Sequence, residues 1–436
     1  MGVSGSLESY HAAGTRRGVV LGLAALLHWP EMDVLFLSPA YPPEMLQFSR
    51  GLAEVGARVH GVGDTPVHEM APDVRRHLAS YLHVPAMGDI VDVHRRIVAW
   101  LGGRRPDRVE ALWEPMQMLA AELRAELSLP GMRPDVVLGF RDKPLMRARV
   151  EKAGVRVPRT VRVCTRNEAR SAIKRVGFPA ILKPVDGAGG ADTHRVSDMA
   201  AFEAALASMA HVPEATVEEF IDGEEFTYET LCIDGTIVYE SVCRYAPTVL
   251  VARRNEWISP IIQSLRGVDD PEIAPGVAMG RQAVAALGMD TGVTHMEWFR
   301  KADGTTIFGE IACRPPGASM VDLMNFSDDQ DLYRDWASAV VTGAIAPRAP
   351  RPWSAAIVFK RAQGQGRIQK IVGLEAFVAA HRPYIARVDL LPIGAPRRDW
   401  TQTFLSDGNL VVRHPDEDTA FALAREAAAK ITMYAG

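Results

Sequence analysis

Short apolar runs alternate with amphipathic segments along the first third of the chain. Residues 34–38 and 58–62 have the length and composition of buried parallel strands, and residues 48–55 between them have the pattern of a helix. Residues 135–139 form another apolar run, which we interpret as a later strand. This alternation predicts a doubly wound, Rossmann-like α/β domain over residues 32–142.

From residue 143 onward, strands are expected to outnumber helices. The predicted strands are 178–185, 193–196, 215–221, 227–233, 236–243, 295–300, 305–311 and 409–412, and the predicted helices are 199–209, 275–287 and 416–433. Prolines at 347, 350 and 352 mark a linker. The expected organisation is therefore a second domain over 143–347, with subdomains of about 143–214 and 215–347, and a small α+β unit over 348–436.

Composition narrows the class of protein without identifying it. The 436 residues carry 49 Lys and Arg against 53 Asp and Glu, so the formal net charge is -4 and no basic nucleic-acid-binding surface is expected. The four cysteines include no C-x-x-C pair, which argues against a disulfide framework or a zinc site. No apolar run is long enough to span a membrane. We expect a cytoplasmic protein that binds neither membrane nor nucleic acid.

Residues 1–31 are expected to be a leader, either an extra helix or disordered, ahead of a natural start near Met32. Arg16 and Arg17 precede an apolar stretch in the manner of a twin-arginine signal, but no A-x-A-like cleavage site follows.

A lysine next to a glycine-rich loop is the first candidate for chemistry. Lys183 stands near the end of a predicted strand, and Gly187, Gly189 and Gly190 follow it. The lysine ammonium can contact phosphate oxygens, and the glycines let backbone N–H groups approach them. The segment is not a Walker A loop, and a surface hairpin with an exposed lysine would look similar.

The strand over 215–221 suggests a purine pocket. Apolar Phe220 and Ile221 can line adenine while their backbone bonds the ring edge, and Glu225 can accept hydrogen bonds from ribose hydroxyls. A half-buried strand with solvated acids is the structural alternative.

Two glutamates flank a predicted hairpin turn. If Asp303 and Gly304 form a two-residue loop, Glu297 lies directly opposite Glu310. Facing carboxylates repel each other on a sheet, and a divalent cation between them removes that repulsion. Mg²⁺ suits such a pair, because it prefers a few carboxylates plus substrate phosphates. An exposed pair screened by water is the alternative.

Several basic or aromatic side chains are candidate substrate ligands. Arg314 can clamp a carboxylate or a phosphoryl group, although it could instead pair with Glu297 or Asp322. His295 has apolar neighbours, so a satisfied core histidine is the stronger interpretation. The segment 245–264 is a candidate acceptor pocket or a plain surface loop. Its candidate ligands are Arg253, Arg254 and Trp257.

The order of these motifs resembles the ATP-grasp superfamily, most closely the carboxylate–amine ligases of the L-amino-acid ligase and carnosine synthase kind, and more distantly biotin carboxylase. Residues 292–297 (GVTHME) and 309–317 (GEIACRPPG) resemble the G-x-x-H-x-E and E-I-x-x-R-x-x-G elements of that group. The resemblance covers about residues 32–430. It implies an ATP-grasp fold, preceded by the α/β domain and followed by a small closing subdomain.

The resemblance also implies roles for individual residues. Lys143 and Lys183 hold ATP phosphates beneath the loop 186–193, and Glu218 and Glu219 lie at the adenine. Glu297 and Glu310 bind one or two Mg²⁺ ions, with Mn²⁺ as an alternative ion. Arg314 and Lys183 stabilise the transferring group. The implied reaction is ATP-dependent formation of an amide or peptide bond through an acyl phosphate, with small carboxylate and amine substrates, typically amino acids, and a homodimer as the common assembly.

One position departs from the family pattern. An asparagine often stands two residues after the second glutamate as a further metal ligand, and here that residue is Ala312. This puts a second magnesium ion in doubt and leaves open a catalytically decayed ATP-binding regulatory protein. Independently of Ala312, a biotin carboxylase-like or purine-pathway ATP-grasp enzyme is the other alternative to the ligase.

Overall fold

The computed structural model describes residues 32–185, 192–401 and 406–436. The expected leader, residues 1–31, and the glycines Gly187, Gly189 and Gly190 lie outside the described residues. Residues Met32–Gly436 form one compact unit. The description below concerns that unit alone.

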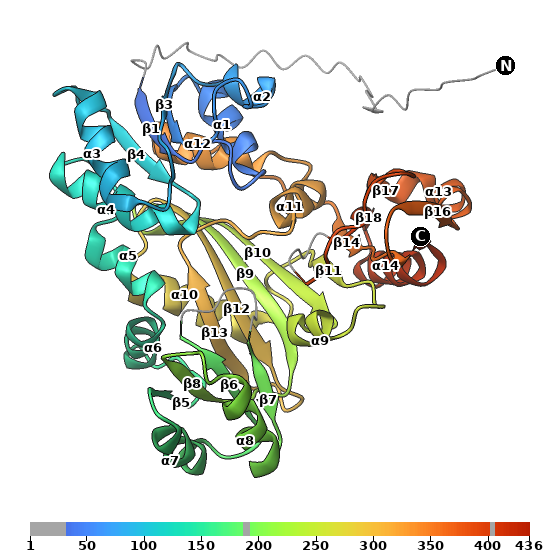
Figure 1. Cartoon of the computed structure of the whole chain (residues 1–436). Helices are drawn as coiled ribbons and strands as arrows, with labels where there is room; N and C mark the ends of the chain where they lie inside the picture. The colour runs from blue at the N-terminus through green and yellow to red at the C-terminus, as the bar shows by residue number, and fades with distance from the viewer. Residues whose placement is uncertain (1–31, 186–191, 402–405) are drawn as a thin grey trace. The chain divides into compact units, whose positions relative to one another are not determined.

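A parallel four-stranded sheet in the order β3-β2-β1-β4 forms the N-terminal part of this unit (Figure 1). Its central strand β1 is almost fully buried, because helices pack on both faces. On one face, Phe36 packs with Phe48 and Trp336, and on the other Leu35 and Leu37 pack with Ile97 and Leu119. The predicted doubly wound α/β class is confirmed. The elements are β1 (Asp33–Leu37), α1 (Met45–Glu54), β2 (Arg58–Gly63), α2 (Pro72–Arg75), β3 (Ser80–His83), α3 (Ile90–Leu101), β4 (Arg108–Ala111), η1 (Glu114–Met116), α4 (Gln117–Glu126) and, from later in the chain, α12 (Leu332–Thr342).

The strand predicted at 135–139 is wrong. This segment lies in helix α5 (Pro134–Arg141), which begins with Pro134 and buries Val137 and Phe140 three residues apart on one face. The edge strand beside β1 is β4, which the apolar pattern did not reveal. A short apolar run fits a buried helix turn as well as a strand, and here the core formed with α6 and α10 decides the outcome.

A second, antiparallel sheet in the order β5-β8-β6-β7 is covered on one face by α7 and α8 (Figure 1). Val163, Leu182 and Val217 point into that covered face and are buried. Because side chains alternate along a strand, Lys183 and Glu218 lie on the opposite face. The elements are α6 (Lys143–Lys152), β5 (Thr160–Val163), α7 (Arg166–Val176), β6 (Ala180–Pro184), β7 (His194–Val196), α8 (Met199–Ser208) and β8 (Ala215–Glu219).

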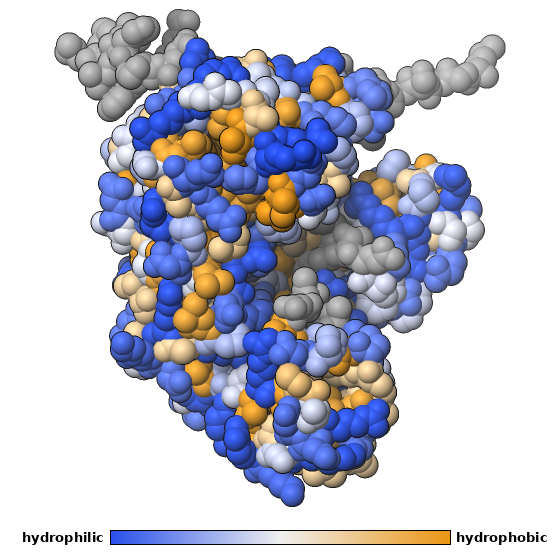
Figure 2. All heavy atoms as spheres, turned by 60° about the vertical axis from the view of Figure 1, so that its left-hand side comes forward, coloured by the Kyte–Doolittle hydropathy of each residue, from blue (hydrophilic) through white to orange (hydrophobic). Residues whose placement is uncertain are grey.

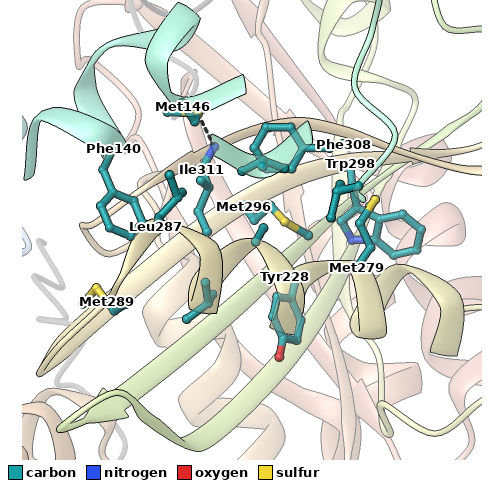
Figure 3. Close-up of a cluster of buried hydrophobic side chains, with 14 of the residues drawn as sticks. Phe140, Met146, Tyr228, Met279, Leu287, Met289, Met296, Trp298, Phe308 and Ile311 are labelled. Carbon is teal, nitrogen blue, oxygen red and sulfur yellow. Dashed lines mark hydrogen bonds between the residues drawn. The ribbon is translucent and has the colours of Figure 1, made fainter. Parts of the chain in front are cut away.

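The largest sheet has the strand order β13-β12-β9-β10-β11-β14-β18-β17 and is antiparallel throughout its recorded pairings. One face of its β9, β12 and β13 strands carries Tyr228, Met296 and Trp298, which pack against α10 and Met146 of α6 (Figure 3). Phe226 stacks on Trp298 with ring centroids 4.7 Å apart. The remaining elements are β9 (Glu224–Ile233), β10 (Thr236–Ala246), α9 (Val249–Arg254), β11 (Ile261–Ser264), α10 (Ala274–Leu287), β12 (Gly292–Arg300), β13 (Thr306–Ala312) and α11 (Met320–Asp328).

The C-terminal part completes the large sheet and adds a three-stranded sheet in the order β15-β19-β16. Its elements are β14 (Ser354–Phe359), β15 (Gln363–Gly364), β16 (Ile368–Val372), α13 (Leu374–His381), η2 (Arg382–Tyr384), β17 (Ile385–Leu390), β18 (Gly408–His414), α14 (Glu417–Lys430) and β19 (Thr432–Ala435). Within the described ranges, none of the helices combines the length and hydrophobicity that crossing a bilayer requires. The face drawn in Figure 2 is largely hydrophilic, with apolar residues in scattered groups.

Candidate functional site

The β12–β13 hairpin places Glu297 directly opposite Glu310, as predicted, but by another route. The turn is longer than predicted: Lys301 N–H bonds to Thr305 O at 3.0 Å, so Ala302 does not pair with Thr305. The register then shifts by one residue between Glu297 and Trp298, where Gly309 has no partner in the pairing. The longer turn and this β-bulge offset each other, which restores the expected pair of glutamates.

Glu297 and Glu310 share the sheet face that is turned away from the α10 core, and Glu225 of β9 lies on the same face. The Glu225 carboxylate accepts a hydrogen bond from Val249 N–H at 2.7 Å. Burial, together with the charges of Glu297 and Glu310, raises the pKa of Glu225 to about 8. Three acidic side chains therefore share one face of the sheet, and the repulsion between the facing pair, Glu297 and Glu310, favours a bound cation.

Lys143 supplies a positive charge at this point. Helix α6 begins at Lys143, capped by the Asp142 carboxylate, which accepts a hydrogen bond from Leu145 N–H at 2.8 Å. The Lys143 ammonium lies 2.8 Å from the Glu310 carboxylate. Burial opposes ionisation of Glu310, but Lys143 and Lys183 outweigh it and lower the pKa of Glu310 to about 2. Glu310 is therefore a carboxylate at neutral pH.

Lys183 reaches the same region from strand β6. Its ammonium is 3.2 Å from the Glu218 carboxylate, which also pairs with Arg147 at 2.8 Å. Burial works against the charge of Glu218, yet Lys183 and Arg147 hold its pKa below the usual value. Glu219 pairs instead with Arg156 at 2.7 Å. The two glutamates expected at adenine thus use their side chains to hold cations, so any adenine contact would come from their backbone.

Part of the backbone after strand β8 already makes a hydrogen bond within the protein. Phe220 N–H donates to Pro179 O at 3.2 Å, and the Arg195 guanidinium lies 4.2 Å from the Phe220 ring centre. Ile221 is 9% exposed. Of the two residues predicted at the ring edge, Ile221 is therefore the one left to offer its N–H group.

Lys143 and Lys183 both line a cavity of about 510 Å³ between α6 and the open face of the β5-β8-β6-β7 sheet. Arg147, Arg159 and Arg162 also line it, and the charged lining is predominantly basic. The buried Thr216 hydroxyl lines this cavity and has no hydrogen-bond partner among the described residues. A basic cavity with a free hydroxyl has the chemistry of a phosphate-binding site.

A second cavity, of about 600 Å³, borders Glu297, His295 and Arg314. Arg314 donates to Glu114 at 2.8 Å, so its partner is neither Glu297 nor Asp322, the alternatives considered from sequence. His295 Nδ1 lies 2.8 Å from Glu229, and His295 Nε2 lies 3.7 Å from Glu297. Burial lowers and Glu229 raises the pKa of His295, with a net rise to about 9.

The predicted acceptor segment contributes only partly to this cavity. Arg253 lines it, together with Tyr245. Arg254 instead donates to Thr193 O at 3.1 Å. Trp257 is 58% exposed and lies 5.4 Å below the Arg397 guanidinium, away from the cavity lining.

Three partners of the site residues were missed from sequence: Glu114, Arg147 and Glu229. Arg147 follows Lys143 by one helical turn, so helical spacing could have shown that both face the same way. The other two lie far along the chain from the residues they approach, and no local pattern marks them.

These residues fit a magnesium–nucleotide complex better than a bare metal ion. No cluster of three or more His, Cys, Asp or Glu side chains suited to a metal is found in the described part of the chain. Two facing carboxylates beside two lysines leave a cation to be completed by phosphate oxygens and water, which is how Mg²⁺ is commonly bound.

Comparison with known proteins identifies a family match and relatives of this chain. Residues 148–328 match the ATP-grasp domain family. An L-arginine-specific L-amino acid ligase of Bacillus subtilis is 24% identical over 245 residues, which cover 52% of this chain and 58% of the relative. A formate-dependent phosphoribosylglycinamide formyltransferase of Solidesulfovibrio magneticus is 27% identical over 269 residues, which cover 59% of this chain and 62% of the relative. The match thus spans less than two thirds of either relative.

Solved structures cover nearly all of the chain. An L-amino acid ligase from Bacillus licheniformis superimposes with a TM-score of 0.72 at 20% identity, covering 93% of this chain and 99% of that one. The biotin carboxylase domain of a Hydrogenobacter thermophilus 2-oxoglutarate carboxylase, solved with MgADP and bicarbonate, gives a TM-score of 0.66 at 16% identity, covering 92% and 91%. The chain therefore has the ATP-grasp fold, and residues 148–328 match the ATP-grasp domain family.

Proposed function

We propose that this protein is an ATP-dependent carboxylate–amine ligase that forms an amide or peptide bond and releases ADP and phosphate. The observation that carries the proposal is the convergence of Lys143, Lys183, Glu297, Glu310 and Arg314, from four separate segments, around one face of the large sheet. Cations for phosphates, carboxylates for a metal and an arginine for the reacting group are the parts that phosphoryl transfer to a carboxylate requires.

Each residue has a proposed task. Lys143 and Lys183 hold the phosphate oxygens of ATP, and Glu297 and Glu310 hold Mg²⁺. The metal, when bound, neutralises charge on the transferring phosphoryl group. Arg314 is oriented by Glu114, so its remaining N–H groups are directed to the substrate carboxylate or the acyl phosphate formed from it.

The second cavity is the proposed substrate site. It touches Glu297 and Arg314 at one end, and Arg253 lines its wall. Arg253 has no acidic partner among the described residues, so we assign it to the carboxylate of the amine-bearing substrate, which then attacks the acyl carbon as phosphate leaves. Amino acids fit this role, and the similarity to L-amino acid ligases supports them as substrates.

Measured ADP release tests the proposal. Purified protein with Mg²⁺-ATP is incubated with single and paired amino acids, and products are identified by mass spectrometry. We expect ADP release that depends on amino acids and is lost in Lys183→Ala and Glu310→Ala, with unchanged melting temperature. ADP release that depends on bicarbonate or formate alone would support the carboxylase-like or purine-pathway alternative. Tight ATP binding without turnover on any acid would support the regulatory alternative.

A further inference from the structure

The charged side chains that line the 600 Å³ cavity are not all paired. Glu114 bonds to Arg314 and lies 3.7 Å from Arg141. His295 pairs with Glu229. Two charged side chains of the lining remain without an ion pair to any described residue: Arg253, already assigned to the acceptor, and Glu44.

Glu44 is placed at the cavity by the start of helix α1. It is the residue before Met45, the first residue of the helix, and its side chain does not cap the helix N–H groups. The carboxyl group interacts with the backbone N–H of Glu44 itself and caps no N–H group of the helix, so its remaining acceptor positions can face a ligand.

The surroundings of Glu44 make it a poor place for an unpaired anion. The side chain is half-buried. Burial and the nearby charge of Asp322 raise the pKa of Glu44, and Arg314 only partly offsets them. Asp322 is itself occupied by Tyr333 at 2.6 Å and Arg387 at 2.5 Å. A cationic ligand group would relieve the repulsion that Arg314 only partly offsets.

The position of Glu44 relative to Arg314 indicates which kind of cationic ligand Glu44 binds. Both residues line the same cavity, and the charge of Arg314 acts on Glu44 to lower its pKa. If Arg314 receives the carboxylate that is activated, Glu44 lies close to the atoms next to that carboxylate. A molecule with an ammonium group beside its carboxylate satisfies both residues, and α-amino acids have this arrangement.

Building on the ligase function proposed above, we propose that Glu44 is a specificity-determining residue that binds the ammonium group of the activated substrate. The acid that is activated is then an α-amino acid rather than a simple carboxylic acid. The apolar side chains of Met45, Leu112, Trp113, Ile262 and Met320 line the same cavity, so an apolar amino acid side chain suits the remaining space.

Hydroxylamine isolates this step from the choice of acceptor. Hydroxylamine attacks the acyl phosphate, displaces phosphate and gives a hydroxamate that is measured directly. The probes are matched pairs, leucine with 4-methylpentanoate and phenylalanine with 3-phenylpropanoate, which differ only in the ammonium group. Wild type, Glu44→Gln and Glu54→Gln are compared. Glu54 lies in the same helix α1 but pairs with Arg50 at 2.8 Å, and it does not line the cavity.

We expect the wild type and Glu54→Gln to prefer the amino acid by tenfold or more in kcat/KM. In Glu44→Gln this preference falls at least tenfold, through a higher KM for the amino acid, while KM for ATP and the melting temperature stay unchanged. Glu44→Asp keeps the charge and recovers part of the preference. A merely structural role for Glu44 would lower activity on both members of a pair alike.

The outcomes separate the two proposals. If the wild type uses the deaminated acids as well as the amino acids, or if Glu44→Gln keeps the wild-type preference, the Glu44 assignment is overturned while the ligase function stands. If the wild type forms neither hydroxamate nor ADP with any acid, the ligase function fails and the Glu44 assignment fails with it.

Discussion

The glycine at the β-bulge offers a sharp test of how the hairpin sets the two glutamates. A Cβ atom added to Gly309 would lie 2.7 Å from Glu297 O and 3.2 Å from the Glu297 carbonyl carbon, and real Cβ atoms essentially never come within 3.0 Å. Both close atoms belong to the backbone, so strand β13 has to move relative to β12. Overpacking of this kind costs about 1–3 kcal/mol of unfolding free energy.

This strand movement would occur next to Glu297 and Glu310, the two glutamates that we propose to bind Mg²⁺. Glu310 follows Gly309 directly, so the displaced strand changes the distance between the two glutamates. A shift of about 1 Å in a positioned group costs up to ~10²-fold in rate. We therefore expect Gly309→Ala to lower the melting temperature by a few degrees and ADP formation by at least tenfold, with a higher Mg²⁺ requirement.

Thermal unfolding, Mg²⁺ titration and ADP release measure these effects. Gly88→Ala is the matched control, because a Cβ at Gly88 meets nothing within 4 Å, and it should behave as wild type. A Gly309→Ala protein with wild-type stability and the wild-type Mg²⁺ requirement would refute the link between bulge and site.

Three further predictions follow from single side chains. Lys143→Met leaves Glu310 without its ion pair and should reduce ADP formation about 10²-fold, whereas Lys152→Met, at the exposed end of the same helix, should leave it unchanged. Ala312→Asn adds an amide oxygen near the metal site, so half-maximal activity should need the same or less Mg²⁺, and a several-fold higher requirement would contradict this. Burial lowers the pKa of Lys360 from 10.5 to about 8, so the unfolded chain binds more protons between these pH values. Unfolding free energy should therefore rise over pH 8–10.5 by up to ~3 kcal/mol relative to Lys360→Met. An unfolding free energy with the same pH dependence in the wild type and in Lys360→Met would contradict a lowered pKa of Lys360.

Sequence patterns predicted the strands well where alternation and length agreed. The strands predicted at 215–221, 227–233 and 295–300 all occur, with ends shifted by a few residues. The run at 135–139 failed because its three consecutive apolar side chains, Val136, Val137 and Leu138, carry no period of their own, and only packing against α6 and α10 makes the segment helical. Strand β4, with charged residues at two of four positions, gave no apolar signal at all.

The motifs predicted which side chains come together at the candidate site. They did not predict the ion pairs and hydrogen bonds that fix the positions of those side chains. Lys143, Lys183, Glu297 and Glu310 lie together as their order along the chain suggested. Glu218 was expected to lie at the adenine, which stays a prediction, and the sequence did not show that Lys183 and Arg147 hold its carboxylate. Local sequence does not report partners supplied by a neighbouring strand or helix.

The facing glutamates show how a correct prediction can rest on an incorrect step. Counting outward from a two-residue turn gave the right pair. The turn is one residue longer than assumed, and the unpaired Gly309 at the bulge shifts the register back by one residue. Glycine is required at the bulge because the backbone of the opposite strand passes too close for any side chain. Turn and bulge are therefore coupled: shortening the turn without removing the bulge would place Glu297 out of step with Glu310, and the facing pair that we propose to bind Mg²⁺ would be lost even though both glutamates remained in the chain.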